Sequence, residues 1–138
     1  MAAAVPACHA TRPRRVLGSV PNHDLPRYLQ RARVFVLPSH YEGHPKALLE
    51  AMACGLPVIG SDVPGIRELL HHGETGYLCP PSPDGIRTAV ELLLGDAALR
   101  HRLGQQARQY VLDHFALNRI VELELAMLHA VAAGRSQP

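Results

Sequence analysis

Residues 38–64 read PSHYEGHPKALLEAMACGLPVIGSDVP, and this stretch decides the fold. Within it, Pro45–Ala53 can form a helix that Gly55 ends, because proline suits a first helical turn and glycine the position after the last one. Two short apolar runs flank this helix, Val34–Leu37 before it and Val58-Ile59 after it. Continuous apolar runs are typical of strands buried on both faces of a parallel sheet. The stretch therefore predicts a strand, a helix and a second strand.

The residues before this unit predict one more strand and one more helix. Val16–Ser19 suggests a short strand, and Asp24–Arg33 carries apolar side chains at helical spacing. Residues 1–15 are rich in Ala, Pro and Arg without periodicity, so we interpret them as a disordered tail. The folded domain is then expected over residues 16–138.

The residues after the unit continue the alternation of helices and strands. Pro64-Gly65 predicts a turn, Ile66–Leu70 a short helix and Tyr77-Leu78 a small strand. Three helices are then expected, capped in the first two cases by Asp84 and Asp96. They cover Gly85–Leu94, residues 97–115 and residues 118–132. The alternation predicts an α/β fold, with a Rossmann-like parallel sheet of about four strands flanked by helices.

The composition excludes several classes of function. The formal net charge of the 138-residue chain is only +2, which argues against a nucleic-acid surface. Cys8, Cys54 and Cys79 form no C-x-x-C pair, so reduced thiols in a cytoplasmic protein are the simplest interpretation. No group of Cys and His has zinc spacing, and we expect no metal site. No apolar run reaches the length of a membrane-spanning helix.

A binding site is expected where the strand Val34–Leu37 leads into the helix that begins at Pro45. Ligands of open parallel sheets bind at the carboxyl ends of the strands. The loop there leads into a helix N-terminus, whose free N–H groups and positive dipole end suit a diphosphate. Gly43 lets the backbone approach a ligand closely. Glu42 lies on this loop, and Glu50 lies ~8 Å along the helix, a reach that suits the ribose of a nucleotide. Taken alone, a glutamate within a helix, such as Glu50, is most often a solvated charge, and a loop glutamate before glycine, such as Glu42, is most often part of a turn.

The whole stretch resembles the signature of family 4 glycosyltransferases, whose fold is the two-domain GT-B type. The signature has two glutamates separated by seven residues, here Glu42 and Glu50. The resemblance continues through GIRELL at 65–70 and GETGYL at 73–78, and covers roughly Val16 to Val131, nearly all of the chain. It implies that the chain is part of the C-terminal, nucleotide-sugar-binding domain of a retaining enzyme.

The resemblance also implies a role for each residue of the motif. Glu50 should bind the nucleotide ribose, and Glu42 should face the donor sugar and the reacting centre as the catalytic residue. Pro45 has no N–H and can only shape the loop. The remaining donor-binding positions are Gly43, His44, Lys46, Ala47, Leu48 and Leu49.

By the same resemblance, the reaction moves a glycosyl group from a nucleoside-diphosphate sugar to an acceptor, without an obligatory metal or other cofactor. An N-terminal acceptor domain and two strands that carry an Arg and a Lys for the diphosphate have no counterpart in the chain. A truncated product, a gene fragment and half of a split enzyme with a partner chain all fit this absence. In the complete domain the two missing strands lie between Val16–Ser19 and Val34–Leu37. Without them, one edge of the strand Val34–Leu37 is expected either to be open or to be covered by Val16–Ser19. Peripheral membrane contact by the full enzyme stays open, as do two other readings of the chain, a non-catalytic binding module and an unrelated nucleotide-binding domain.

Overall fold

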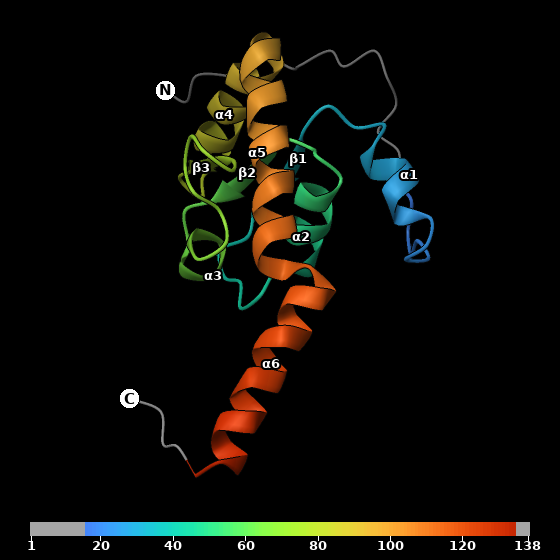
Figure 1. Cartoon of the computed structure of the whole chain (residues 1–138). Coiled ribbons are helices and arrows are strands. Elements are labelled where there is room, and N and C mark those ends of the chain that lie inside the picture. Colours follow the sequence, from blue (N-terminus) through green and yellow to red (C-terminus); the bar gives the residue numbers. More distant parts are fainter. Residues whose placement is uncertain (1–15, 135–138) are drawn as a thin grey trace, which may run out of the picture.

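The computed structural model describes residues 16–134. The expected tail, Cys8 and the last four residues lie outside this range. Helices and strands alternate and then give way to three consecutive helices (Figure 1). In chain order they are α1 Leu25–Leu29, β1 Phe35–Leu37, α2 Lys46–Ala53, β2 Val58–Ser61, α3 Pro64–Arg67, β3 Tyr77–Cys79, α4 Pro83–Gly95, α5 Ala97–Phe115 and α6 Leu117–Ala132.

The three strands form a parallel sheet in the order β1-β2-β3. Phe35 is opposite Val58 in the first pair, and Ile59 is opposite Tyr77 in the second. The expected α/β class and the expected order of these three strands are therefore confirmed. All four residues of β2 are buried, as a central strand requires, whereas the residues of β1 are only partly buried because β1 lies at the sheet edge.

The prediction of a strand at Val16–Ser19 is wrong, and the sheet has three strands in place of about four. A strand needs a neighbouring strand that accepts and donates backbone hydrogen bonds. Val16–Ser19 has no such neighbour within residues 16–134. Val16 is 92% exposed, so no packing holds it against the sheet either. Of the two outcomes expected for this segment, it stands apart, and no strand within residues 16–134 pairs with the outer edge of β1.

Several boundaries also differ from the prediction. The helix expected over Asp24–Arg33 is only the five residues of α1, and the short helix α3 begins at Pro64 itself, at the expected turn. Asp84 does not cap α4. The Ser82 hydroxyl accepts the hydrogen bond from the Gly85 N–H at 3.2 Å, because Pro83 already occupies the first helical position. Asp96 caps α5 as predicted, accepting from the Leu99 N–H at 2.8 Å.

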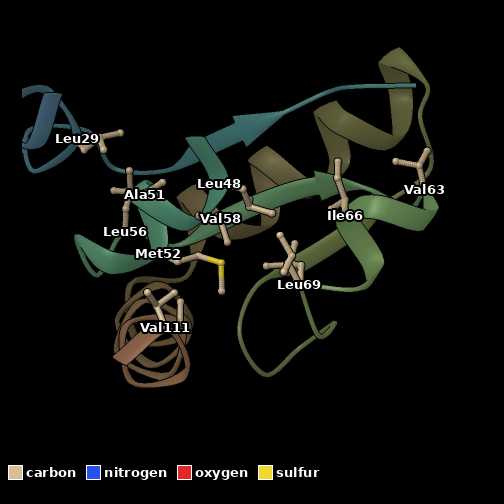
Figure 2. Close-up of a cluster of buried hydrophobic side chains, with 12 residues drawn as sticks. Leu29, Leu48, Ala51, Met52, Leu56, Val58, Val63, Ile66, Leu69 and Val111 are labelled. Carbon is tan, nitrogen blue, oxygen red and sulfur yellow. The ribbon is translucent and has the colours of Figure 1, made fainter. Parts of the chain in front are cut away.

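Two hydrophobic clusters occupy the two faces of β2. Val58 points into the larger cluster with Leu48 and Met52 of α2, Ile66 of α3 and Val111 of α5 (Figure 2). Ile59, the next residue along the strand, points into a second cluster. That cluster holds Cys79, Ala89, Leu93 and Leu103. The helices α2 and α3 are thereby fixed against the strand whose carboxyl end lies next to the expected site.

Helix α6 contributes no buried residue to either hydrophobic cluster. None of its residues is buried, and it projects away from the sheet (Figure 1). Its exposed apolar side chains include Leu117, Val121, Leu128 and Val131, of which Leu117 is 79% exposed. Between α5 and α6 stands one non-helical residue, Ala116, with φ −63° and ψ 138°.

Candidate nucleotide-sugar site

The carboxyl ends of β1 and β2 lie side by side, since the two strands are parallel neighbours. The loop after β1 carries Glu42, and Ser39 of the same loop donates a hydrogen bond from its hydroxyl to Glu42 Oε1 at 2.6 Å. Both side chains are partly buried. The carboxylate of Glu42 is therefore held by its own loop at the edge where a ligand of a parallel sheet binds.

The backbone of this loop rests directly on α3. A Cβ built on Gly65 would lie 2.0 Å from the carbonyl oxygen of Glu42 and 2.8 Å from that of Gly43. Both carbonyls therefore face α3 at a distance that only glycine permits. In a trans peptide the N–H points opposite to the C=O, and residues 16–134 contain no cis peptide. The N–H groups of Gly43 and His44 consequently point away from α3, toward the open side of the loop.

The N-terminus of α2 follows immediately. Pro45 is buried and stands at the N-cap with φ −73° and ψ 91°. The N–H groups of Leu48 and Leu49 donate to its carbonyl at 3.1 and 3.4 Å. Their hydrogens are thus engaged, which leaves Lys46 and Ala47 as the first-turn N–H groups without an intrahelical acceptor. Together with Gly43 and His44 these two form a run of backbone donors beside Glu42.

The side chains of these residues divide by exposure. Leu48 is completely buried and Leu49 partly buried, and their N–H groups already donate to Pro45, so the expected donor-binding role of these two residues has no free group to rest on. Lys46 and His44 are exposed, and the His44 ring lies 6.3 Å from the ring of Phe115 between centroids. Lys46 forms no ion pair with any residue in 16–134, so its ammonium is available to an anion near the α2 N-terminus.

Glu50 is half-buried and faces α1 across a small cavity. The cavity measures about 210 Å³ and is mostly apolar. Its other lining residues are Asn22, Leu25, Pro26, Leu29, Ala53 and Cys54. The motif predicts a role for Glu50, but only the helical spacing of Leu25 and Leu29 hints at the wall that α1 places opposite it. Glu42 thus lies on the loop after β1, whereas Glu50 faces the space between α1 and α2.

An ion pair that the sequence did not predict stands at the carboxyl end of β2. Arg67 Nε lies 2.7 Å from Asp62 Oδ1, and the hydrogen bond to this carboxylate raises the pKa of the guanidinium. Both partners are about half-exposed. Arg67 is therefore already paired, which makes it a poor counterpart for the diphosphate-binding arginine that the sequence resemblance implies.

Neither a metal cluster nor a membrane span is found in the part of the chain that the structure describes. Across residues 16–134 there is no group of three His, Cys, Asp or Glu side chains placed to share a metal ion. The helices in the same range are too short or too polar to cross a bilayer.

The sequence profile named "Glycosyl transferases group 1" matches residues 8–110, about three quarters of the chain. The chain belongs to this family. N-acetyl-alpha-D-glucosaminyl L-malate synthase of Bacillus anthracis is 38% identical over 108 residues, which are 78% of this chain and 28% of that protein. Glycogen synthase of Mycobacterium tuberculosis is 34% identical over 128 residues, 92% of this chain and 31% of that protein.

Solved structures of GT-B glycosyltransferases have the same fold. Sucrose-phosphate synthase from Thermosynechococcus elongatus superposes with a TM-score of 0.70 at 34% identity, over 79% of this chain and 27% of that one. HepE of Anabaena, solved with UDP-glucose, also reaches 0.70 over 78% of this chain and 30% of that one, at 23% identity. The fold is thus that of part of a GT-B glycosyltransferase, and the chain spans less than a third of the length of these relatives.

Proposed function

We propose that this chain forms the donor-binding part of a retaining glycosyltransferase of family 4, which takes a glycosyl group from a nucleoside-diphosphate sugar. The observation that carries the proposal is the contact of Gly65 with the Glu42 and Gly43 carbonyls. It turns two N–H groups outward beside the N-terminus of α2. A run of such donors suits the phosphates and sugar hydroxyls of the donor.

In this proposal the two glutamates have separate tasks. The carboxylate of Glu50 accepts hydrogen bonds from the ribose hydroxyls in the cavity between α1 and α2. Glu42, oriented by Ser39, stands beside the anomeric carbon, where its charge stabilises the oxocarbenium-like centre. The bond between this carbon and the diphosphate breaks, the acceptor oxygen forms a new bond on the same face, and its proton passes to the departing diphosphate oxygen.

The departing diphosphate gains negative charge as this bond breaks. The free N–H groups at the start of α2, the dipole of that helix and the Lys46 ammonium offset this charge, and we propose that no metal is obligatory. The acceptor side is assigned to a domain or partner chain outside these residues. The relatives' greater length supports this assignment.

Calorimetric titration with UDP, GDP and ADP tests the site on the chain itself. We expect one of them to bind, and Glu50→Ala to weaken its binding by about 1–3 kcal/mol, the scale of a hydrogen bond to a charged group. Glu91→Ala is the matched control, because Glu91 is an exposed glutamate on α4, away from the site. Equal affinities for the two variants would remove Glu50 from the site. Absence of binding by all three nucleotides would favour a non-catalytic module.

A further inference from the structure

A second hollow lies at the amino ends of the strands and adjoins the cavity beside Glu50, with which it shares Leu29 and Cys54. It measures about 430 Å³ and is bounded by the segment after α1, the loop Cys54–Pro57 and one face of α5. Arg33, on its wall, stands two residues before β1, and Pro57 directly precedes β2. The hollow is therefore at the amino ends of the strands, whereas Glu42 is at their carboxyl ends. Strands of three to four residues separate the two places by roughly 10–13 Å.

The lining of this hollow carries positive charge only. Its charged side chains are Arg33, Arg100 and Arg108, with His101 beside them, and neither Asp nor Glu takes part. We call this place the basic hollow and define it by these four residues. Three guanidinium groups around one concave surface repel one another unless an anion lies between them.

Two of these guanidinium groups are fixed in place. Nη1 of Arg100 donates to the carbonyls of Leu93 and Leu94 at 2.5 and 2.7 Å, at the end of α4. Nη1 of Arg108 donates to the carbonyl of Ala53 at 2.6 Å, at the end of α2. Each bond occupies one nitrogen of a group that has five N–H donors, so donors remain for a ligand. Arg33 takes part in no ion pair within residues 16–134.

The other residues that line the basic hollow also favour an anion with an organic part. Ala97, the first residue of the 19-residue helix α5, lines the hollow and brings the positive end of that helix to it. Leu29, Ala32 and Leu56 supply an apolar patch next to the charges. We propose that the basic hollow binds a soluble phosphate ester, with the phosphate between the guanidinium groups and the organic part against the apolar patch. Guanidinium groups match phosphate oxygens in charge and geometry, and the volume suits a small organic ligand.

Titration of the full chain with phenyl phosphate, followed by amide NMR, tests the proposal. We expect the amide signals of Arg33, Leu56 and the first turn of α5 to shift, and inorganic phosphate to bind more weakly. Arg33→Gln should weaken binding about tenfold, as expected for the loss of a charged hydrogen bond. Arg119→Gln, which removes the same charge from the exposed helix α6, should leave the affinity unchanged.

Three results would overturn the proposal, and each differs from a failure of the donor site. Shifts confined to Gly43–Ala47 would place the phosphate at the donor site. An equal loss of phenyl phosphate affinity in Arg33→Gln and Arg119→Gln would show that the binding depends only on the overall charge of the chain. Tighter binding to phosphatidylglycerol vesicles than to phenyl phosphate, with the same dependence on Arg33, would assign the basic hollow to a lipid surface.

Discussion

Replacing Gly65 with alanine should damage the donor site more than the fold. The added Cβ would lie 2.0 Å from the Glu42 carbonyl oxygen, where ordinary contact begins at 3.4 Å, so the loop must retreat by about 1.4 Å. Hydrogen bonds from N–H groups extend over only about 2.7–3.2 Å, so a shift of this size breaks those that Gly43 and His44 make to a ligand. Each such bond to a charged group contributes about 1.5–3 kcal/mol. We therefore expect diphosphate affinity to fall at least tenfold, and about a hundredfold if both bonds are lost.

The same substitution should cost about 1–3 kcal/mol of unfolding free energy, the usual range for overpacking. Gly104→Ala is a matched control, because its Cβ would lie 2.2 Å from the carbonyl oxygen of Gly55, a similar clash at the other edge of the sheet. Thermal unfolding and calorimetric titration with the nucleoside diphosphate that binds would be measured for both variants. We expect comparable losses of stability but a loss of affinity in Gly65→Ala alone.

Two outcomes would refute this reasoning. If Gly65→Ala binds the diphosphate as tightly as the unsubstituted chain, the Gly43 and His44 amides do not contact it. If both glycine variants lose affinity in proportion to their stability, Gly65 acts only through the fold and positions nothing.

The remaining predictions concern stability and association. In thermal unfolding, Ser82→Ala should lose about 1 kcal/mol as the α4 cap, while Asp84→Ala should lose much less, and the reverse order would contradict the assigned cap. Burial raises the pKa of the Cys54 and Cys79 thiols. The stability that comes from keeping these thiols neutral is therefore present below the ordinary thiol pKa, and it is lost as the pH rises through their raised pKa values in the folded protein. Cys54 and Cys79 should accordingly react slowly with iodoacetamide near pH 7, and rapid alkylation of either residue, located by peptide mass mapping, would contradict this. The exposed apolar side chains of α6 should make the chain self-associate, and Leu128→Glu should shift its sedimentation toward monomer. A concentration-independent monomer would refute this last expectation.

Local signals explain which parts of the fold could be predicted from the sequence. Helix α2 begins after Pro45 and ends before Gly55. Proline suits the start because the first N–H groups of a helix have no intrahelical acceptor, and Gly55 suits the end because it adopts φ +73°, which favours glycine. The run Val58-Ile59 is a central strand because both of its faces are covered. In contrast, Val16–Ser19 has strand-like residues but no neighbouring strand to pair with, and pairing is not a local property.

The site follows the same division. Glu42 and Glu50 were found through the motif, and the structure puts them on the loop and helix expected for them. The close contact of Gly65 with the Glu42 carbonyl joins residues from different elements, so no spacing in the sequence reveals it. The cavity beside Glu50 likewise depends on how α1 packs against α2.

The single residue between α5 and α6 determines how far the molecule reaches. Helix α6 is about 24 Å long at 1.5 Å per residue, and none of its side chains is buried. Its direction therefore depends on the two dihedral angles of Ala116. A rotation of about 30° there swings the far end through about 12 Å by the geometry of a rigid rod. The longest dimension of the described part, residues 16–134, is thus controlled by one peptide unit, and a label at the end of α6 would report its angle as a distance to the sheet.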